Sequence, residues 1–391
     1  MSDVRVPLLW LSGPTGVGKS SVGWELFAQL SRSGVKTAFV DADQISLCYP
    51  TPEGTTHHVR AKNLAAMLPN FLEEGVRCLV LAGFVHTSEE VRTYTDLLPE
   101  AAFTLCRLRV GSAELKGRFL GRGWRPDLVE EALAEAEALE RSEYADVCVA
   151  TGGVTVPEAA RLVRERLGGW PGVLPAVTPK SSVDRQSRPP APPGAPLPVL
   201  WLCGATAVGK STVGYEIFRQ IYGTGVRAAY VDVKQVGALR PHVDGHGLKA
   251  RNLAAVWSGY RAMGARCLVV SGEADSGDVV RGYAESLPGA AVTVCRLHAG
   301  PATLAGRVAQ RGRGGGPAIP GDELRGLGSD ALHRIAERAA REAAVLDRAG
   351  AGHLRIETDG RSAGEVAADV RVRSGGWPFL SGGRARPTGS G

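Results

Sequence analysis

Residues 13–20 have the sequence GPTGVGKS, and a near copy, GATAVGKS, stands at residues 204–211. Both fit the pattern G-x-x-x-x-G-K-[ST], the P-loop that wraps the phosphates of a nucleotide. In this pattern glycines let backbone N–H groups face inward, the lysine reaches the terminal phosphates and the hydroxyl ligates Mg²⁺. Apolar runs of strand length precede both loops, at residues 7–12 and 198–203, and amphipathic stretches follow them. The sequence therefore predicts two strand–loop–helix units, each with phosphate at the N-terminus of its helix.

The residues of both loops are expected to bind the nucleotide. In the first loop these residues are Gly13, Thr15, Gly16, Val17, Gly18, Lys19, Ser20 and Ser21. In the second loop they are Gly204, Thr206, Ala207, Val208, Gly209, Lys210, Ser211 and Thr212. The metal ligands expected beside the phosphates are the two loop hydroxyls and one carboxylate from each half: Ser20, Asp41, Ser211 and Asp232.

The similarity between the two parts of the chain extends well beyond the loops. A shift of 191 residues aligns the loops, and a shift of 189 aligns NLAA at residues 63–66 with NLAA at residues 252–255. A shift of 207 aligns the Trp-Pro pairs at residues 170–171 and 377–378, so the second copy holds about 18 extra residues. Copies of this length are too long for solenoid repeats and indicate a duplicated domain.

This duplication sets the expected domain bounds. We expect P-loop domains at residues 1–174 and 199–380, joined by a Pro/Ser-rich linker at residues 175–198. Residues 381–391 are expected to form a disordered tail. The sequence leaves open whether the two domains contact each other.

Short apolar runs alternate with amphipathic stretches through the first copy. Strands are predicted near residues 8–12, 37–40, 78–82, 103–108 and 147–150. Helices are predicted near residues 20–31, 59–74, 88–98, 112–122, 128–142 and 157–167. The pattern predicts an α/β fold in which each domain is a five-stranded parallel sheet with helices on both faces. Ligands of such sheets bind beyond the carboxyl ends of the strands.

Two acidic residues follow the second predicted strand. Alternation along the strand points Asp41 and Asp43 to the same side, toward the phosphates. Carboxylates there can hold the waters of Mg²⁺ and accept a proton from a substrate hydroxyl. The alternative is a solvated turn with a helix cap, a common role of Asp. The third predicted strand ends in Ala82-Gly83-Phe84 without an acid, which argues against a motor ATPase.

Arginines gather in the segment after the fourth predicted strand. Arg118, Arg122 and Arg125 are spaced to lie near one face of a helix and the turn after it. Arginines carried by a mobile flap can neutralise the charge of a phosphoryl group during its transfer. The alternative is a basic helix that faces solvent. The second copy retains Arg307 and Arg311.

Composition and charge limit the classes of function and partner that remain. The chain has 391 residues, 44% of them hydrophobic, with a formal charge of +6 and no dense basic run, so nucleic acid is not an expected partner. No apolar run approaches the length of a membrane span, and a cytoplasmic location without a membrane partner is expected. The seven cysteines indicate no disulfide framework, and buried apolar positions are expected for Cys78, Cys106, Cys267 and Cys295. No Cys/His group has metal-site spacing, and His57-His58 is expected to be a surface pair.

Together these residues resemble those of the small-molecule and nucleotide kinases among P-loop proteins, such as shikimate kinase, gluconate kinase and chloramphenicol-type phosphotransferases. GPTGVGKS, the VDADQ sequence at residues 40–44 and the arginine-bearing segment carry this resemblance. It implies ATP and Mg²⁺ as cofactors, a small hydroxylated acceptor and a flexible lid. It also implies that Asp41 organises Mg²⁺, that Asp43 is the base, and that Arg122 or Arg125 is the lid arginine. The triple glycine that shikimate kinase has after its third strand is absent, so shikimate itself is not the expected acceptor.

The sequence thus predicts an ATP-dependent phosphotransferase that works mainly through its first copy. Catalysis is assigned to Lys19, Asp41, Asp43, Arg118, Arg122 and Arg125. In the second copy Lys234 stands where Asp43 stands in the first, so this copy is expected to bind nucleotide and transfer phosphate poorly. Two alternatives remain open: a regulatory protein with tandem nucleotide sites, and a nucleotide-hydrolysing switch.

Overall fold

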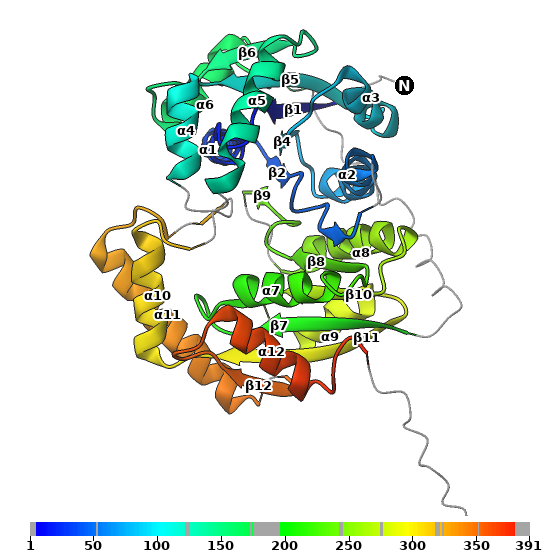
Figure 1. The fold of residues 1–391 in the computed structure, drawn as a ribbon, viewed down its shortest axis with the longest axis vertical. Helices are drawn as coiled ribbons and strands as arrows, with labels where there is room; N and C mark the ends of the chain where they lie inside the picture. The colour runs from blue at the N-terminus through cyan, green and yellow to red at the C-terminus, as the bar shows by residue number, and fades with distance from the viewer. Residues whose placement is uncertain are drawn as a thin grey trace, which may run out of the picture.

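The two halves of the chain, up to residue 172 and from residue 196 onward, each alternate strands and helices (Figure 1). The computed structural model describes residues 5–379 except for 52–53, 122–125, 173, 175–195, 242–244, 274–276, 317–320, 323 and 351. The elements of the first half are β1 (Val6–Ser12), α1 (Lys19–Arg32), β2 (Thr37–Asp41), β3 (Cys48–Tyr49), α2 (Thr56–Glu73), β4 (Cys78–Ala82), α3 (Ser88–Leu97), β5 (Ala101–Arg109), α4 (Ser112–Leu120), the 3-10 helix η1 (Pro126–Leu128), α5 (Val129–Glu140), β6 (Val147–Ala150) and α6 (Val156–Arg166). The elements of the second half are β7 (Leu197–Cys203), α7 (Lys210–Tyr222), β8 (Ala228–Asp232), β9 (Leu239–Arg240), α8 (Gly247–Ala262), β10 (Cys267–Ser271), α9 (Gly277–Ser286), β11 (Ala290–His298), α10 (Pro301–Gly312), α11 (Ser329–Arg348), β12 (Leu354–Glu357) and α12 (Ala363–Arg373).

Each half contains one sheet, and the two sheets have the same strand order. The first runs β6-β5-β1-β4-β2-β9 and the second runs β12-β11-β7-β10-β8-β3. The first five strands of each sheet are parallel. The α/β class is therefore correct, but the prediction of a purely parallel five-stranded sheet is wrong. Each sheet has a sixth strand that is antiparallel and comes from the other half.

The sixth strands are exchanged reciprocally between the halves. β9 pairs with β2, so that Ala38 stands opposite Leu239, and β3 pairs with β8, so that Cys48 stands opposite Ala229. The exchanged strands carry side chains into the other core: the Tyr49 ring centroid lies 5.9 Å from that of Phe218. Two-residue strands are too short to show alternation, so β3 and β9 could not be predicted from the sequence.

Helices cover both faces of each sheet. α1 and α6 enclose a core with one face of the first sheet, and α7 and α12 do the same for the second. On the other faces, α2 and α8 pack against each other (Figure 1), and one continuous apolar core joins the two sheets through them. Polar interactions add to the packing between these two helices. Asn70 Nδ2 donates to Asn252 Oδ1 at 2.8 Å, and Arg251 forms an ion pair with Glu74 at 2.6 Å. The two halves thus form one body.

The elements of the first half agree closely with the predicted ranges. The central strands are almost wholly apolar because helices bury both of their faces, as in β4, where every residue is buried. A capping box, in which Thr87 and Glu90 each accept a backbone N–H of the other, begins α3. Residues 197–198, expected in the linker, belong to β7, whereas residues 175–195 and the tail at 381–391 lie outside the described residues. Within the described chain, none of the helices combines the length and apolarity that a membrane crossing needs.

Candidate functional site

The two P-loops have the backbone conformation that their glycines allow. Gly13, Gly16 and Gly18 have φ angles of 135°, 94° and 108°, in the left-handed region that favours glycine. A Cβ atom on Gly13 would lie 2.6 Å from the carbonyl oxygen of Leu108, so only glycine fits there. The loop is therefore shaped in advance, with α1 beginning directly after it at Lys19.

The lysine of each loop lies against the loop's own backbone. Lys19 Nζ donates to the carbonyl oxygens of Gly13 and Pro14 at 2.8 and 3.0 Å. Lys210 Nζ makes the equivalent bonds to Gly204 and Ala205 at 2.8 and 3.0 Å. Burial, followed by the nearby charge of Lys234, lowers the pKa of Lys210 to about 8. Both lysines are thus held at the mouth of the loop, where the phosphates of a bound nucleotide would lie.

The second loop carries a strained residue. Ala207, which aligns with Gly16, has a φ of 63°, and among the described residues it is the sole non-glycine residue with a positive φ. An L-residue in this conformation costs about 1–2 kcal/mol.

Replacing Ala207 with Gly should therefore stabilise the second half. We expect a gain of about 0.5–1 kcal/mol in the free energy of unfolding, because the relief of strain exceeds the added flexibility of glycine in the unfolded chain. The matched change Gly16→Ala should destabilise the first half by about 1 kcal/mol or more. Urea unfolding measures both, and a loss of stability in Ala207→Gly would contradict the strain.

A serine–aspartate pair stands beside each lysine. Ser20 Oγ donates to Asp41 Oδ2 at 2.7 Å, and Ser211 Oγ donates to Asp232 Oδ2 at 2.6 Å. Burial, together with the neighbouring charge of Asp43, raises the pKa of Asp41 to about 6. The four predicted metal ligands thus lie together in pairs. Their oxygen donors suit Mg²⁺, which binds through carboxylates and hydroxyls beside substrate phosphates.

Asp43 lies next to this pair in the first half. Its backbone N–H donates to Asp41 Oδ1 at 3.0 Å, and its carboxylate, 58% exposed, forms an ion pair with Arg60. The Arg60 guanidinium is buried and stacks over the ring of Phe84 at 4.3 Å. Arg60 was not among the predicted site residues, because its position within α2 gives no sign that its side chain reaches the end of β2.

The second half has a different set of charges at the same place. Lys234, Glu273 and Lys249 align with Asp43, Phe84 and Arg60, respectively. Lys234 and Lys249 each lie 3.2 Å from a carboxylate oxygen of Glu273. Although burial opposes it, the two lysines lower the pKa of Glu273 to about 2. The second half therefore has a lysine-rich ion cluster where the first half has an exposed carboxylate.

Arg118 is held against the loop rather than free on a flap. Its guanidinium donates to the carbonyl oxygens of Val17 and Thr151, both at 2.8 Å, and to Glu114 at 2.6 Å. Arg307 makes the same contacts to Val208 and Thr358 in the second half. Arg118 thus ties α4 to the P-loop and to the turn after β6. The other two predicted arginines, Arg122 and Arg125, lie outside the described residues.

One glutamate in each half contacts the P-loop backbone, and neither was among the predicted site residues. Glu135 of α5 accepts the backbone N–H of Thr15 at 3.0 Å, and Glu342 of α11 accepts that of Thr206 at 2.9 Å. Burial opposes ionisation of Glu135, but hydrogen bonds from His86 and from Thr15 lower its pKa overall. A carboxylate thus accepts a backbone N–H of each loop. The two glutamates are related by the same shift of 207 residues as the two Trp-Pro pairs, and this match could have indicated them in the sequence.

A cavity opens at the second P-loop. It has a volume of about 510 Å³ and is lined by loop residues, by Lys234 and Glu273, and by the α11 residues Arg338, Arg341 and Glu342. This volume lies within the range typical of small-molecule sites. The second half therefore has room for a ligand at its P-loop, beside cationic side chains.

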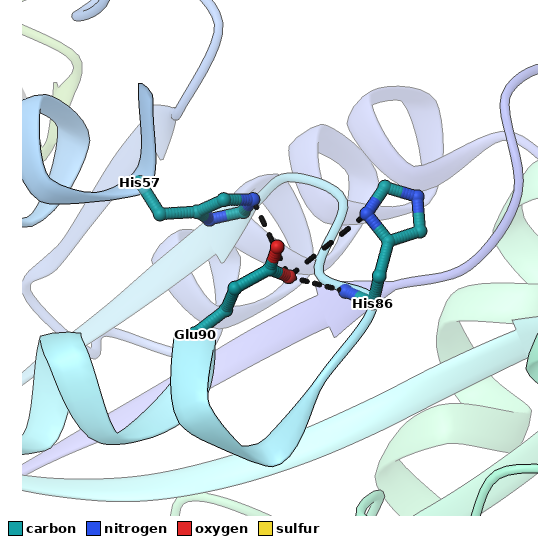
Figure 2. A group of neighbouring side chains, drawn as sticks. All are labelled: His57, His86 and Glu90. Carbon is teal, nitrogen blue, oxygen red and sulfur yellow. Dashed lines mark hydrogen bonds and ion pairs between the residues drawn. The ribbon is translucent and has the colours of Figure 1, made fainter. Parts of the chain in front are cut away.

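Beside the first P-loop, His57, His86 and Glu90 come together (Figure 2). His58 is exposed, but only 12% of the His57 side chain is, so the prediction of a surface pair is wrong for His57. His57 packs edge-on against Phe84, with ring centroids 5.3 Å apart, and burial lowers its pKa to about 4. The fold assembles this cluster from separate elements, so metal-site spacing in the sequence could not reveal it.

Comparisons with known proteins bear on the fold alone. No protein-family model and no curated protein sequence matches this chain. Among solved structures, shikimate kinase from Acinetobacter baumannii in complex with shikimate shares 17% identity, covers 46% of this chain and 96% of its own, and has a TM-score of 0.32. A gluconokinase from Sinorhizobium meliloti 1021 shares 19% identity, with coverage of 42% and 91% and a TM-score of 0.29. The APS kinase of Mycobacterium tuberculosis in complex with AMPPNP and APS shares 16% identity, with coverage of 42% and 98% and a TM-score of 0.32. Over less than half of its length this chain thus resembles shikimate kinase, gluconokinase and APS kinase, and at these identities and TM-scores the likeness says nothing of its substrate or activity.

Proposed function

We propose that the first half of this protein transfers the γ-phosphate of ATP to a hydroxyl group of a small molecule or nucleotide. The observation that carries this proposal is the arrangement at the end of β2. There the Ser20–Asp41 pair adjoins the P-loop lysine, and the exposed carboxylate of Asp43 lies directly beside the pair. A phosphoryl-transfer site needs a phosphate cradle, a metal position and a proton acceptor, and these residues supply all three.

Each group has a distinct task in this proposal. The loop N–H groups and Lys19 bind and orient the phosphates, while Ser20 and Asp41 hold Mg²⁺, which offsets phosphate charge when bound. Asp43 accepts the proton of the attacking hydroxyl, and Arg60 keeps its carboxylate in place. Arg118 fixes the loop through the Val17 carbonyl. Positioning and charge stabilisation, rather than covalent chemistry, supply the catalysis.

The second half is proposed to bind nucleotide without transferring phosphate efficiently. It retains the loop, Lys210 and the Ser211–Asp232 pair, but Lys234 replaces the proton acceptor and is paired with Glu273. This arrangement supports a regulatory role for the second site. The alternative function is that of a tandem nucleotide-binding regulatory protein, in which both halves bind nucleotide and neither hydrolyses or transfers its phosphate rapidly.

Turnover by the intact chain, with and without acceptors, distinguishes the two functions. A phosphotransferase releases ADP faster when the right hydroxylated acceptor is present and yields a phosphorylated product. A regulatory protein binds nucleotide at both sites, and acceptors do not change its slow ADP release. The intact chain is the right material, because each sheet includes a strand from the other half.

The glutamate on the second loop provides a separate test of nucleotide binding. Glu342→Gln should tighten the binding of Mg²⁺–ATP to the second site by about tenfold, roughly 1.4 kcal/mol. The reason is that the carboxylate on the Thr206 N–H repels phosphate, whereas a glutamine oxygen still accepts that hydrogen bond. The measurement is a calorimetric titration of Mg²⁺–ATP into the Lys19→Ala protein, in which binding at the second site is observed by itself.

The matched control for this change is Glu285→Gln. Glu285 is exposed on α9, so its replacement removes the same charge from the second half without touching the loop. In the Lys19→Ala background, adding Glu285→Gln should leave the affinity of the second site for Mg²⁺–ATP unchanged. Unchanged or weaker binding in Glu342→Gln would contradict a phosphate site at this loop.

A further inference from the structure

We propose that His57, His86 and Glu90 form a binding site for one divalent transition-metal ion, and that Zn²⁺ fits the site best. The site lies outside the Ser20–Asp41 pair, and the proposal does not depend on phosphoryl transfer. It rests on the positions of three ligand atoms, on a buried nitrogen without a hydrogen bond and on a carboxylate behind one of the histidines.

The three ligand atoms are close enough to share an ion. They come from the first turn of α2, the segment after β4 and the first turn of α3, and all lie within 4.8 Å of one another (Figure 2). Glu90 Oε2 is 3.5 Å from His57 Nε2 and 3.9 Å from His86 Nδ1. Bonds of about 2.0–2.1 Å in a tetrahedral site separate ligand atoms by roughly 3.4 Å. Small side-chain shifts would therefore complete the geometry.

His57 presents a nitrogen that lacks a hydrogen bond. Nε2 is buried and has no hydrogen-bond partner in the described part of the chain, although it faces the Glu90 carboxylate. The other nitrogen, Nδ1, lies 3.5 Å from the Tyr94 hydroxyl. A buried polar atom without a hydrogen bond costs about 1–3 kcal/mol, so a native structure rarely leaves one without a reason. A metal ion between His57 Nε2 and Glu90 Oε2 would replace their 3.5 Å contact with two direct bonds to the ion.

His86 is oriented from behind by Glu135. His86 Nε2 lies 3.1 Å from Glu135 Oε1, and an ionised carboxylate only accepts, so Nε2 carries the proton. In the neutral ring this leaves the lone pair on Nδ1, the nitrogen that faces Glu90. A carboxylate that holds the far nitrogen of a ligating histidine is the common second layer of zinc sites. The Thr15 N–H in turn holds Glu135 in place.

The donor set and the charges favour a dication of the zinc type. Two imidazole nitrogens and one carboxylate oxygen match catalytic zinc sites, which keep a fourth position open, whereas Mg²⁺ prefers oxygen donors alone. Glu90 and Glu135 bring two negative charges, and the nearby Arg60 is already paired with Asp43. The competing explanation is that His86 is a cation between the two glutamates, and this explanation predicts that no metal binds.

The second half contains a natural control. His246 aligns with His57 and lies 3.0 Å from the Tyr283 hydroxyl, just as His57 lies beside Tyr94. Val279, however, stands at the position of Glu90. The histidine–tyrosine packing is therefore common to both halves, while the carboxylate belongs to the first half alone. We expect one metal site per chain.

The test is a titration of the chelator-treated full chain with Zn²⁺, followed by calorimetry, and with Co²⁺, followed by visible absorption. The unmodified chain should bind one Zn²⁺, and Co²⁺ should show the absorption of a four-coordinate ion. Glu90→Gln should weaken binding at least tenfold while α3 stays intact, because glutamine also satisfies a capping box. His246→Ala, the matched variant, should bind as the unmodified chain does.

Two results would overturn the proposal. One is the absence of stoichiometric Zn²⁺ binding by the folded, unmodified chain, which would leave His86 as a cation between the glutamates. The other is equal affinity in the unmodified chain, Glu90→Gln and His57→Ala, which would place the ion elsewhere. Glu135→Gln tests the positioning role: affinity should fall about 10–100-fold and the Co²⁺ absorption should shift, and unchanged values would contradict that role.

Discussion

Lys19→Ala should reduce acceptor-dependent ADP release by about 10²–10³-fold, a range typical of losing one well-placed donor to developing charge. The structure holds the Lys19 ammonium group at the mouth of the P-loop, within 3.0 Å of two loop carbonyls. Removing the ammonium group should not change the loop conformation, which depends on the glycines, but it removes the cation nearest the expected phosphates. Steady-state kinetics with Mg²⁺–ATP and a productive acceptor measure the loss.

Lys210→Ala is the matched variant for this prediction. It removes the equivalent cation of the second loop, which has the same two carbonyl contacts. We expect it to abolish one of two nucleotide-binding equivalents, with less than a tenfold effect on the rate. If Lys210→Ala instead removed the activity and Lys19→Ala spared it, transfer would belong to the second half.

Asp43→Asn should lower kcat by about 10²–10⁴-fold while nucleotide affinity changes little. The amide keeps the size and hydrogen-bonding oxygen of Asp43, so the contact with Arg60 persists, but it cannot accept the proton of a substrate hydroxyl. A selective effect on kcat separates a proton acceptor from a residue that merely shapes the loop. The measurement is kcat and KM for ATP and acceptor in the two proteins.

Lys234→Asn gives the control for Asp43. Lys234 occupies the same position in the second half and contacts Glu273 rather than a catalytic group. Its replacement should leave kcat unchanged. An equal kcat in Asp43→Asn and the unmodified chain would show that Asp43 is a turn residue, the alternative that the sequence also allowed.

The sequence predicts most of the fold because long elements carry strong signals. β4 is found at its predicted bounds, since five consecutive buried residues form one apolar run. α1 is predicted to within one residue at each end, since the P-loop fixes its start. β3 and β9 were missed because their pairing depends on how the two halves meet, and two residues have no periodicity.

In the candidate site, too, some residues could be predicted from the sequence and others could not. Ser20 and Asp41 could be paired from the sequence, because a motif and a strand end specify their places. Arg60, Glu135 and His57 could not, since each reaches the site from a helix whose packing is set by tertiary contacts. His57 was expected at the surface because it lies in a segment that differs between the two copies.

Phosphoryl transfer by the first half can be tested with a single assay of the unmodified protein. The intact chain is incubated with Mg²⁺–ATP and a panel of hydroxylated small molecules and nucleotides, while ADP and phosphorylated product are quantified together. We expect at least one acceptor to accelerate ADP release, with one phosphorylated product formed for each ADP. Nucleotide binding at both loops, without any acceptor that accelerates release or becomes phosphorylated, would contradict it and favour the regulatory function.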